Sequence, residues 1–284
     1  MKIGFNLLLW TGHVDETHLP QIAALKDAGY DGVEVPMFGG DTAHYRRLGR
    51  QIGDLGLEVT AITMIPDAAH NPLSETALHR QAAVDHLAAS SEWAQALGAA
   101  MLCGPILQPL GLFSGAGPTD VELGRLAEVH RRAAEAAADH GILLVMEYLS
   151  RFESYVITSM AESLAHVRRV DHPNFAVMHD TFHANIEEKD PVGVIAQAAA
   201  ALRHVHIAEN DRGIPGRGHI AFPAHFRALR AIGYDGWLTI EAFSRMSPEL
   251  AAATRLWRDV CPAPEEVYRQ GIAMIRAGWQ AAGG

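Results

Sequence analysis

Cysteines, basic clusters and long apolar runs are all scarce in this sequence, and each scarcity excludes a class of protein. Two cysteines, Cys103 and Cys261, are too few for a disulfide framework and do not form a CxxC pair. The formal net charge of −10, without clustered Lys or Arg, argues against a nucleic-acid partner. No apolar run approaches the roughly 20 residues that span a bilayer, so we expect no membrane partner.

The opening segment also lacks the features of a targeting signal. MKIGFNLLLW carries one lysine and a short apolar run that is typical of a first strand. A signal peptide would need a longer apolar segment and a small-residue cleavage site. Together with the low cysteine count, this favours a cytoplasmic protein. The 49% hydrophobic and 20% charged residues are ordinary for a globular protein with a sizeable core, and we expect a single domain over residues 1–284.

Short apolar or β-branched runs alternate with longer amphipathic stretches along the whole chain, with no low-complexity linker between them. The expected strands are Lys2–Leu9, Gly32–Pro36, Glu58–Ile65, Ala100–Cys103, Ile142–Glu147, Phe175–Asp180, His204–Ala208 and Trp237–Glu241. The expected helices are His18–Ala28, Ala43–Leu55, Glu75–Leu97, Asp120–His140, Met160–Val170, Pro191–Ala200, Pro223–Ile232 and Ala263–Ala281.

This alternation predicts the fold class. Helical patterns end at glycines in positions where a left-handed residue is expected, namely Gly29, Gly56, Gly98, Gly141 and Gly233. Eight strand–helix units imply a parallel sheet, and eight is the number that closes a barrel. An open doubly wound sheet would call for a GxGxxG loop after the first strand, which LLLWTGHVDE does not offer. We therefore predict an α/β protein with a single (β/α)₈ TIM barrel.

Metal-ligand side chains stand at or near the ends of the last four expected strands. These residues are Glu147, Asp180, His206 and Glu241, each about 25 to 35 residues after the one before. Strand ends of a parallel barrel meet at one rim, so four consecutive strands would each deliver one ligand to the same place. Three carboxylates and an imidazole suit Mn²⁺, Mg²⁺ or Co²⁺ better than structural zinc. The alternative is that each acidic residue caps the helix that follows it.

Polar residues also follow three of these positions on the next loop. Glu153 comes after Glu147, His183 after Asp180, and Arg212 after His206. An imidazole and a guanidinium can hydrogen-bond hydroxyl or enediolate oxygens, and Glu153 could orient one of them. The aromatic residues Phe5, Trp10 and Phe113 are expected to line the pocket, and the glycine-rich segment 109–118 could act as a lid. His204 shares the side-chain parity of His206, which indicates a histidine inside the barrel.

Four segments of the C-terminal half resemble the ketose 3-epimerases of the sugar phosphate isomerase/epimerase superfamily, which act on D-tagatose, D-psicose (allulose) or L-ribulose. The segments are EYLSRFE at 147–153, HDTFHANIEE at 179–188, HIAENDRGIPGRG at 206–218 and IEAF at 240–243. The N-terminal half matches only in strand–helix rhythm and in the opening KIGFN. Near these motifs, Ser150 stands where Asn is common, His179 where an apolar residue is common, and Ala242 where Pro is frequent.

The resemblance implies a function for each site residue. Glu147, Asp180, His206 and Glu241 would hold one divalent metal ion, most often Mn²⁺, with Co²⁺ or Mg²⁺ as alternatives. Glu147 and Glu241 would also be catalytic and exchange the C3 proton of a free ketose through a cis-enediolate. The substrate-binding residues Glu153, His183 and Arg212 would hold the O1–O3 end of the sugar. Family members often form dimers or tetramers, so the resemblance implies a homo-oligomer.

Other activities could use the same residues. The nearest alternative is an aldose–ketose or hydroxypyruvate-type isomerase, which shares the enediolate but returns the proton to a neighbouring carbon. A dehydratase of related polyols is a further alternative. A metal-dependent endonuclease would need more His and Asp ligands and a basic surface. A sugar-binding barrel without activity would not need both glutamates.

Overall fold

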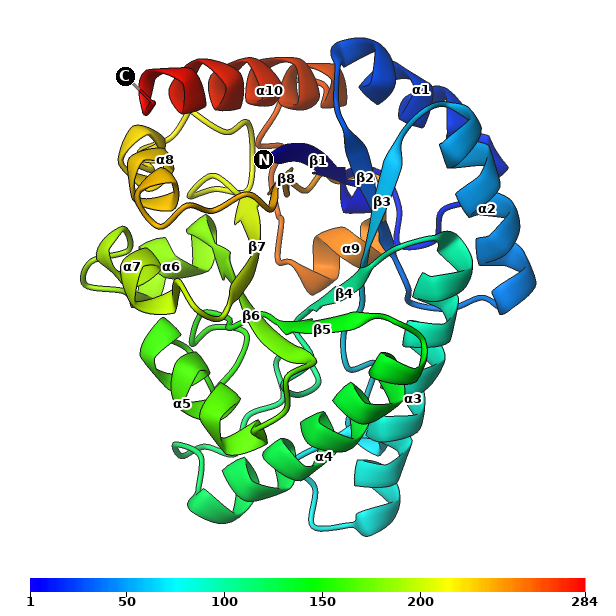
Figure 1. Ribbon diagram of the computed structural model, residues 1–284, viewed down its shortest axis with the longest axis vertical. Coiled ribbons are helices and arrows are strands. Elements are labelled where there is room, and N and C mark those ends of the chain that lie inside the picture. Colours follow the sequence, from blue (N-terminus) through cyan, green and yellow to red (C-terminus); the bar gives the residue numbers. More distant parts are fainter. Residues whose placement is uncertain (284) are drawn as a thin grey trace.

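The chain forms one closed barrel of eight parallel strands surrounded by helices, as the strand–helix alternation predicts. We describe a computed structural model, which covers residues 1–283. The strands follow the order β1-β2-β3-β4-β5-β6-β7-β8, and β1 pairs with β8 to close the ring. Figure 1 shows the strands enclosed by the helical layer, with α10 and α1 side by side where the two ends of the chain meet. The predicted TIM barrel is confirmed.

The strands begin within two residues of their expected starts. Their bounds are β1 Lys2–Asn6, β2 Gly32–Pro36, β3 Glu58–Ile62, β4 Met101–Gly104, β5 Leu143–Met146, β6 Phe175–Asp180, β7 Leu202–Ile207 and β8 Trp237–Ile240. The first and third strands end earlier than predicted. In β1 the reason is Asn6, whose side-chain oxygen accepts a hydrogen bond from the Leu8 N–H and starts the short 3₁₀ helix η1 (Leu7–Leu9).

The long helices match the expected stretches to within two residues at each end. Their bounds are α1 Leu19–Ala28, α2 Thr42–Asp54, α3 Ala77–Leu97, α4 Asp120–Asp139, α5 Met160–Val170, α8 Phe222–Ala231 and α10 Pro264–Ala281. The segment expected at 191–200 contains the shorter α7, Gly193–Ala198. Helices α6 (Thr181–Glu187) and α9 (Pro248–Ala253) and the 3₁₀ helices η2 (Glu16–His18) and η3 (Ala68–His70) were not expected. All five glycines predicted to end helical patterns have a positive φ.

Side-chain alternation along the strands produces two apolar layers. The larger core lies between the barrel and the surrounding helices. A smaller cluster includes side chains of β4, β5 and β6 that point into the barrel, among them Cys103, Val145, Ala176 and Met178. Several inward positions of β1, β2, β3 and β7 are instead polar: Asn6, Glu34, Thr60, His204 and His206 are all buried. Ile62 of β3, by contrast, belongs to the apolar cluster. One half of the barrel interior is therefore apolar, and the other half holds ionisable groups.

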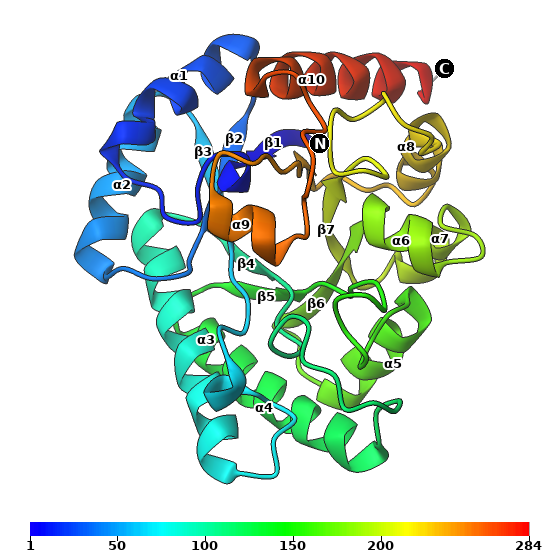
Figure 2. The same ribbon diagram turned by 180° about the vertical axis from the view of Figure 1, so that it is seen from behind.

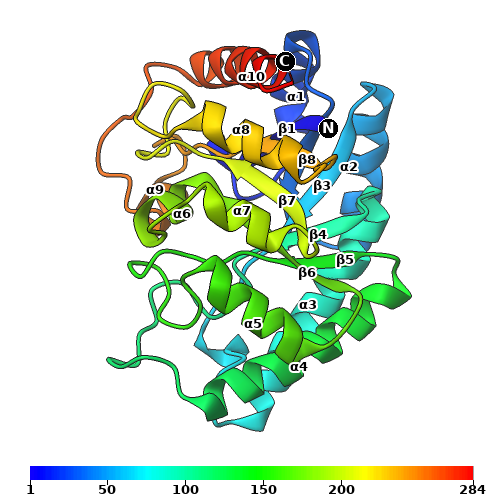
Figure 3. The same ribbon diagram turned by 60° about the vertical axis from the view of Figure 1, so that its left-hand side comes forward.

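Loops at the carboxyl ends of the strands form one open face of the barrel. In Figure 2 the short helix α9 lies in front of the strands, and Figure 3 shows α9 and α6 on the same side of the molecule. Helix α6 begins directly where β6 ends, with Asp180 as its N-cap. This face is where the residues predicted to carry the chemistry converge. Within residues 1–283, no helix has the length and apolar content needed to cross a membrane.

Candidate active site

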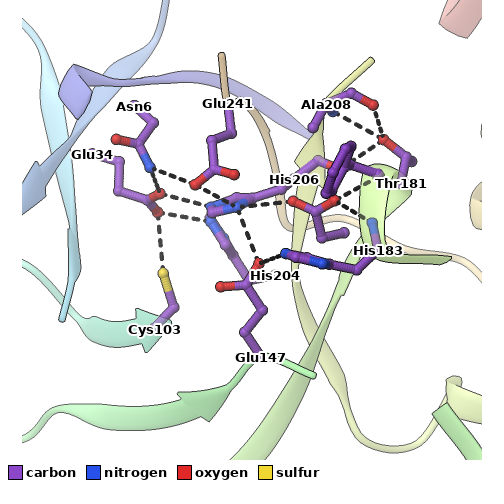
Figure 4. Close-up of polar contacts among 12 residues, drawn as sticks. Asn6, Glu34, Cys103, Glu147, Thr181, His183, His204, His206, Ala208 and Glu241 are labelled. Carbon is purple, nitrogen blue, oxygen red and sulfur yellow. Dashed lines mark hydrogen bonds and ion pairs between the residues drawn. The ribbon is translucent and has the colours of Figure 1, made fainter. Parts of the chain in front are cut away.

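Four buried ligand groups meet at the carboxyl-end rim of the barrel. Glu147, Asp180, His206 and Glu241 each offer one ligand atom, and these atoms lie within 4.8 Å of one another. His206 Nδ1 is 3.4 Å from Glu241 Oε1, 3.5 Å from Asp180 Oδ2 and 3.8 Å from Glu147 Oε1. Figure 4 shows His206 between Glu241 and Glu147. Ligands that share one cation with bonds of about 2.1 Å lie roughly 3.0–4.2 Å apart, depending on the angle between the bonds, so this spacing suits a bound metal ion.

Three of these atoms lack any other partner. Glu147 Oε1, Asp180 Oδ2 and His206 Nδ1 are buried without a hydrogen bond. Buried polar atoms without partners are costly, and three of them facing one point fit a site for a cation. The donor set of carboxylate oxygens and one imidazole nitrogen fits a hard divalent ion.

Asp180 shows how one carboxylate serves two purposes. Its Oδ1 accepts hydrogen bonds from the backbone N–H groups of Phe182 and His183, at 2.6 and 3.1 Å, and thereby caps α6. The alternative that the acidic residue caps the following helix is therefore correct for Oδ1 of Asp180. The second oxygen remains free and faces the other ligands.

Burial and mutual repulsion shift the pKa values of these acids in different directions. Burial raises the pKa of Glu147 well above its ordinary value, with the charges of Glu241 and Asp180 adding to the shift. Burial and the charge of Asp180 also raise the pKa of Glu241, to about 7. Burial would raise the pKa of Asp180 too, but the adjacent His206 and nearby positive charge hold it well below its ordinary value. Because the acids repel one another, a divalent cation would stabilise all three as carboxylates.

Glu153, His183 and Arg212 lie together beside the ligands, as the sequence predicts. Arg212 Nη2 is 3.1 Å from Glu153 Oε1 and 3.0 Å from His183 Nε2. The guanidinium stacks between the rings of Phe182 and Phe243, whose centroids are 4.1 and 4.9 Å from its central carbon. Arg212 has a φ of 60°, in the left-handed region that non-glycine residues seldom adopt. This strained backbone and the two rings hold the guanidinium in one place.

The protonation of His183 follows from its contacts. The Ser150 backbone N–H donates to His183 Nδ1 at 2.9 Å, so in the neutral ring the hydrogen is on Nε2. Burial, together with the charge of Arg212, lowers the pKa of His183 to about 4 despite nearby Asp180, which keeps the ring neutral at pH 7. His183 Nε2–H and the Arg212 guanidinium are both donors 3.0 Å apart. An acceptor oxygen placed between them would satisfy both.

A cavity opens beside the ligands, two of which, Glu147 and Glu241, line it. Its polar lining also includes Glu153, His183 and Arg212. Apolar residues make up most of the remaining lining, including Leu8, Phe38, Ile62, Met64, Leu110 and Leu250. A largely apolar cavity with a few convergent polar groups is typical of a small-molecule site.

The expectation that Phe5, Trp10 and Phe113 line the pocket is corrected by the structure, because none of the three reaches this cavity. Phe5 is fully buried in the outer core, since its neighbour Asn6 points inward and alternation turns Phe5 outward. Trp10 follows η1 and packs against Phe5, with ring centroids 5.2 Å apart. Phe113 is 47% exposed on the loop after β4. From the 109–118 segment, Leu110 is the residue that lines the cavity.

Comparisons with known proteins agree with this architecture. Residues 22–278 match the family described as "Xylose isomerase-like TIM barrel". A ketose 3-epimerase of Arthrobacter globiformis is 32% identical over 97% of this chain and 96% of its own length. The solved structure of an L-ribulose 3-epimerase is 31% identical, covers 99% of this chain and 95% of that one, and superposes with a TM-score of 0.92.

The chain belongs to the ketose 3-epimerases. It is therefore an isomerase, more narrowly a carbohydrate epimerase. A D-allulose 3-epimerase from Methylomonas sp., solved in complex with D-allulose, has 27% identity and a TM-score of 0.91, and the match covers 98% of this chain and 96% of that one. Ketose 3-epimerase sequence motifs at 147–153, 179–188, 206–218 and 240–243 thus identified the family from the C-terminal half alone.

The sequence analysis of this ketose 3-epimerase missed a second polar layer beneath the ligands. Glu34 Oε1 accepts a hydrogen bond at 2.7 Å from His206 Nε2, and Asn6 donates to both Glu34 and Glu241. His204 also lies in this layer, as its parity with His206 predicts. A signal for Glu34 was present, because it is a single charged residue in the otherwise apolar strand GVEVP.

Proposed function

We propose that this epimerase inverts C3 of a free ketose of the D-tagatose, D-fructose/D-psicose or L-ribulose type. Glu147 and Glu241 would exchange the C3 proton, and Glu147, Asp180, His206 and Glu241 would hold one divalent metal ion, with Mn²⁺ preferred over Co²⁺ or Mg²⁺. The observation that carries the proposal is the convergence of these four ligand atoms, three of them without partners, beside a cavity that Glu147 and Glu241 line. The relatives named for ketose and L-ribulose epimerisation support the substrate class.

The chemistry of a ketose explains why two carboxylates are needed. A C–H group beside a ketone is too weak an acid for an unaided carboxylate at neutral pH. A bound divalent ion supplies Lewis-acid stabilisation of the developing enediolate, worth several kcal/mol. One glutamate removes the C3 proton from one face of the sugar, and the other returns a proton to the opposite face. A single base would tend to restore the original configuration.

The remaining polar groups suit the oxygen-rich end of the sugar. His183 Nε2–H and Arg212 are adjacent donors, and an oxygen that gains negative charge in the enediolate would satisfy both. Glu153 holds Arg212 in place through its 3.1 Å ion pair. The apolar lining of the cavity would face the carbons of the sugar that do not react. The reacting carbons would then lie near the glutamates.

Incubation with a panel of ketoses in deuterated water tests the proposal. The protein is stripped with a chelator and then restored with Mn²⁺, Co²⁺ or Mg²⁺. The restored protein should convert the ketose to its C3 epimer with deuterium at C3 of the sugar, whereas the stripped protein should not. Deuterium at C1 or C2 would instead identify an aldose–ketose isomerase. Epimerisation that persists fully in the stripped protein would contradict the metal site.

A further inference from the structure

Glu34, in the middle of β2, is a buried carboxylate within reach of donors from both sides of the barrel. It has no exposed surface. Its Oε1 accepts hydrogen bonds from His206 Nε2 at 2.7 Å and from Asn6 Nδ2 at 3.0 Å. Figure 4 shows the Glu34 carboxylate facing both His206 and Asn6. The strand register explains the Asn6 contact, because Asn6 pairs with Glu34 between β1 and β2, whereas His206 reaches Glu34 across the barrel interior.

The other oxygen of Glu34 is equally surrounded. Glu34 Oε2 accepts from Thr60 Oγ1 at 3.0 Å and from Cys103 Sγ at 3.3 Å, and it lies 2.8 Å from His204 Nε2. Both oxygens of the carboxylate therefore act as acceptors inside the barrel, and a neutral amide could not accept from all these groups.

Glu34, Cys103, His204 and His206 could be read as a second metal site, because one ligand atom from each lies within 4.8 Å of the others. The distances argue for protons instead. The 2.7 Å separation between His206 Nε2 and Glu34 Oε1 is that of a charge-assisted hydrogen bond, and His204 Nε2 lies 2.8 Å from Glu34 Oε2. Two ligands of a common ion would lie roughly 3.0 Å apart or more. Burial also raises the pKa of Cys103 well above its ordinary value, which disfavours the thiolate that a metal would need.

The position of the ring hydrogen on Nε2 of His206 determines which ring nitrogen carries the lone pair. With Nε2–H donated to Glu34, the lone pair of the neutral ring is on Nδ1, the atom that lies 3.4–3.8 Å from three carboxylates. We propose that Glu34 is a positioning residue that fixes this tautomer and thereby makes His206 a ligand. The inference rests on the proposed function in that it assumes a metal ion at Nδ1. Carboxylate–histidine–metal pairs of this kind orient the ring and raise its basicity.

Asn6 extends the same layer to a glutamate of the proposed proton exchange. Its Nδ2 donates to Glu34 Oε1 and, at 3.3 Å, to Glu241 Oε1. Its Oδ1 accepts from the Leu8 N–H, which fixes the orientation of the amide. Glu34 and Asn6 therefore connect His206 with Glu241 below the site, without themselves lining the cavity.

The test compares wild type with Glu34→Gln, using ¹⁵N NMR of the histidine rings in metal-stripped protein and Mn²⁺ or Co²⁺ titration. The NMR spectra are recorded at a pH high enough to leave His206 neutral, because the charges of Glu34 and Glu241 outweigh burial and raise its pKa. Wild-type His206 should show the Nε2–H tautomer. In Glu34→Gln the amide nitrogen cannot accept, so we expect the Nδ1–H tautomer to appear and metal affinity to fall by about 10- to 100-fold. Thr60→Val is the matched control, because it removes a donor to the other oxygen of Glu34. It should keep the Nε2–H tautomer and the wild-type metal affinity.

Each outcome bears on a separate claim. An Nδ1–H tautomer in wild type would overturn the inference even if Glu34→Gln does not fold. Equal metal affinity and an unchanged tautomer in folded Glu34→Gln would also overturn it, as would two ions bound per chain. If wild type shows the Nε2–H tautomer but binds no divalent ion, the metal site of the proposed function is wrong, and with it the ligand role assigned to His206.

Discussion

At the scale of single residues, the protein holds two of the site carboxylates in fixed orientations. Asp180 caps α6 with Oδ1 and faces the other ligands with Oδ2, whereas Glu241 Oε1 both accepts from Asn6 and lies 3.4 Å from His206 Nδ1. Hydrogen bonds from the backbone or from Asn6 therefore orient these two acids. Such fixed orientation removes the reorganisation that flexible side chains would require during proton transfer.

The two-base mechanism predicts an asymmetric defect in Glu241→Gln. Epimerisation should fall by about 10²- to 10⁴-fold, because one proton-transfer group is lost. Glu147 remains, so the epimer whose C3 proton faces Glu147 should still exchange that proton with deuterated solvent, whereas the other epimer should not. Separate exchange measurements on the two purified epimers check this. Glu147→Gln should show the opposite preference, and both variants must first be shown to bind metal.

Loss of exchange from both epimers in metal-loaded Glu241→Gln would contradict the assignment of one face of C3 to each glutamate. Glu249→Gln is a suitable control, since Glu249 is an exposed residue on α9. It should epimerise at the wild-type rate.

The ligands could be predicted from the sequence, and the layer beneath them could not. Glu147, Asp180 and Glu241 stand where strands end, and parallel strands of a barrel bring their ends to one rim. Glu34 contacts His206 across the barrel interior, and the spacing of residues along the chain does not predict a contact between strands that are not neighbours. The prediction that Phe5 lines the pocket failed for a related reason. Side chains alternate along a strand, and Phe5 points outward because Asn6 points into the barrel.

At the scale of elements, the short helices were the hardest to predict and bear most directly on the cavity. Helix α9 has only six residues, too few for a clear helical period, yet it contributes Leu250 to the apolar lining of the cavity. Helix α6 follows β6 without a loop, so the sequence FAVMHDTFHANIE was read as a strand followed by a loop. The long helices carry clear capping signals, such as the Thr119–Glu122 and Ser159–Glu162 capping boxes.

Leu250→Ala should weaken sugar binding without slowing the chemical step. Leu250 belongs to the apolar lining of the cavity, which we expect to contact unreactive carbons, and removing its methyl and methylene groups costs up to about 2 kcal/mol of burial. We expect kcat/KM to fall by roughly 3- to 30-fold, mainly through KM, because contacts to unreactive carbons bind substrate and transition state alike. Steady-state kinetics with two ketoses measure the effect. A fall in kcat with unchanged KM would place Leu250 elsewhere in the reaction.

The interface of α4 and α5 contains a buried histidine pair that predicts acid sensitivity. His130 Nδ1 lies 2.9 Å from His166 Nε2, and burial lowers the pKa of His130 to about 4 and that of His166 to about 2. An unfolded histidine titrates near 6.5, so below that pH the unfolded chain binds protons that the folded chain does not. Stability should therefore fall as pH falls, by about 2.5 kcal/mol for the pair between pH 7.5 and 5.5.

Urea unfolding at several pH values, in the presence of a chelator, measures this dependence. His166→Leu removes one of the two groups and should reduce the pair's contribution to the slope by about half. Leu78→Ala, at an exposed site on α3, should leave the slope unchanged. A slope that His166→Leu does not alter would mean that the pair is protonated in the folded protein.

At the scale of the whole molecule, closure of the barrel brings together residues that are remote in sequence. The pairing of β1 with β8 sets Asn6 beside Glu241, and β7 places His206 across from Glu34 on β2. The N-terminal half, whose sequence resembles the family only in rhythm, thus supplies the support for ligands from the C-terminal half. Counting strand–helix units was enough to predict the closure, because eight parallel units have one common closed form.

Closure also gathers three acids in a buried space, so the stability of the whole fold should depend on a divalent ion. Removing the metal with a chelator should lower Tm, since Glu147, Asp180 and Glu241 then repel one another without compensation. Restoring Mn²⁺ at about 100 times its Kd should return roughly 2.7 kcal/mol, a rise in Tm on the order of 5 °C. Asp180→Asn keeps the amide oxygen at the cap but weakens the site, so its Tm should respond much less to Mn²⁺. Differential scanning calorimetry of both proteins, with and without metal, decides the matter: an equal metal-induced shift in the two would show that the ion binds elsewhere.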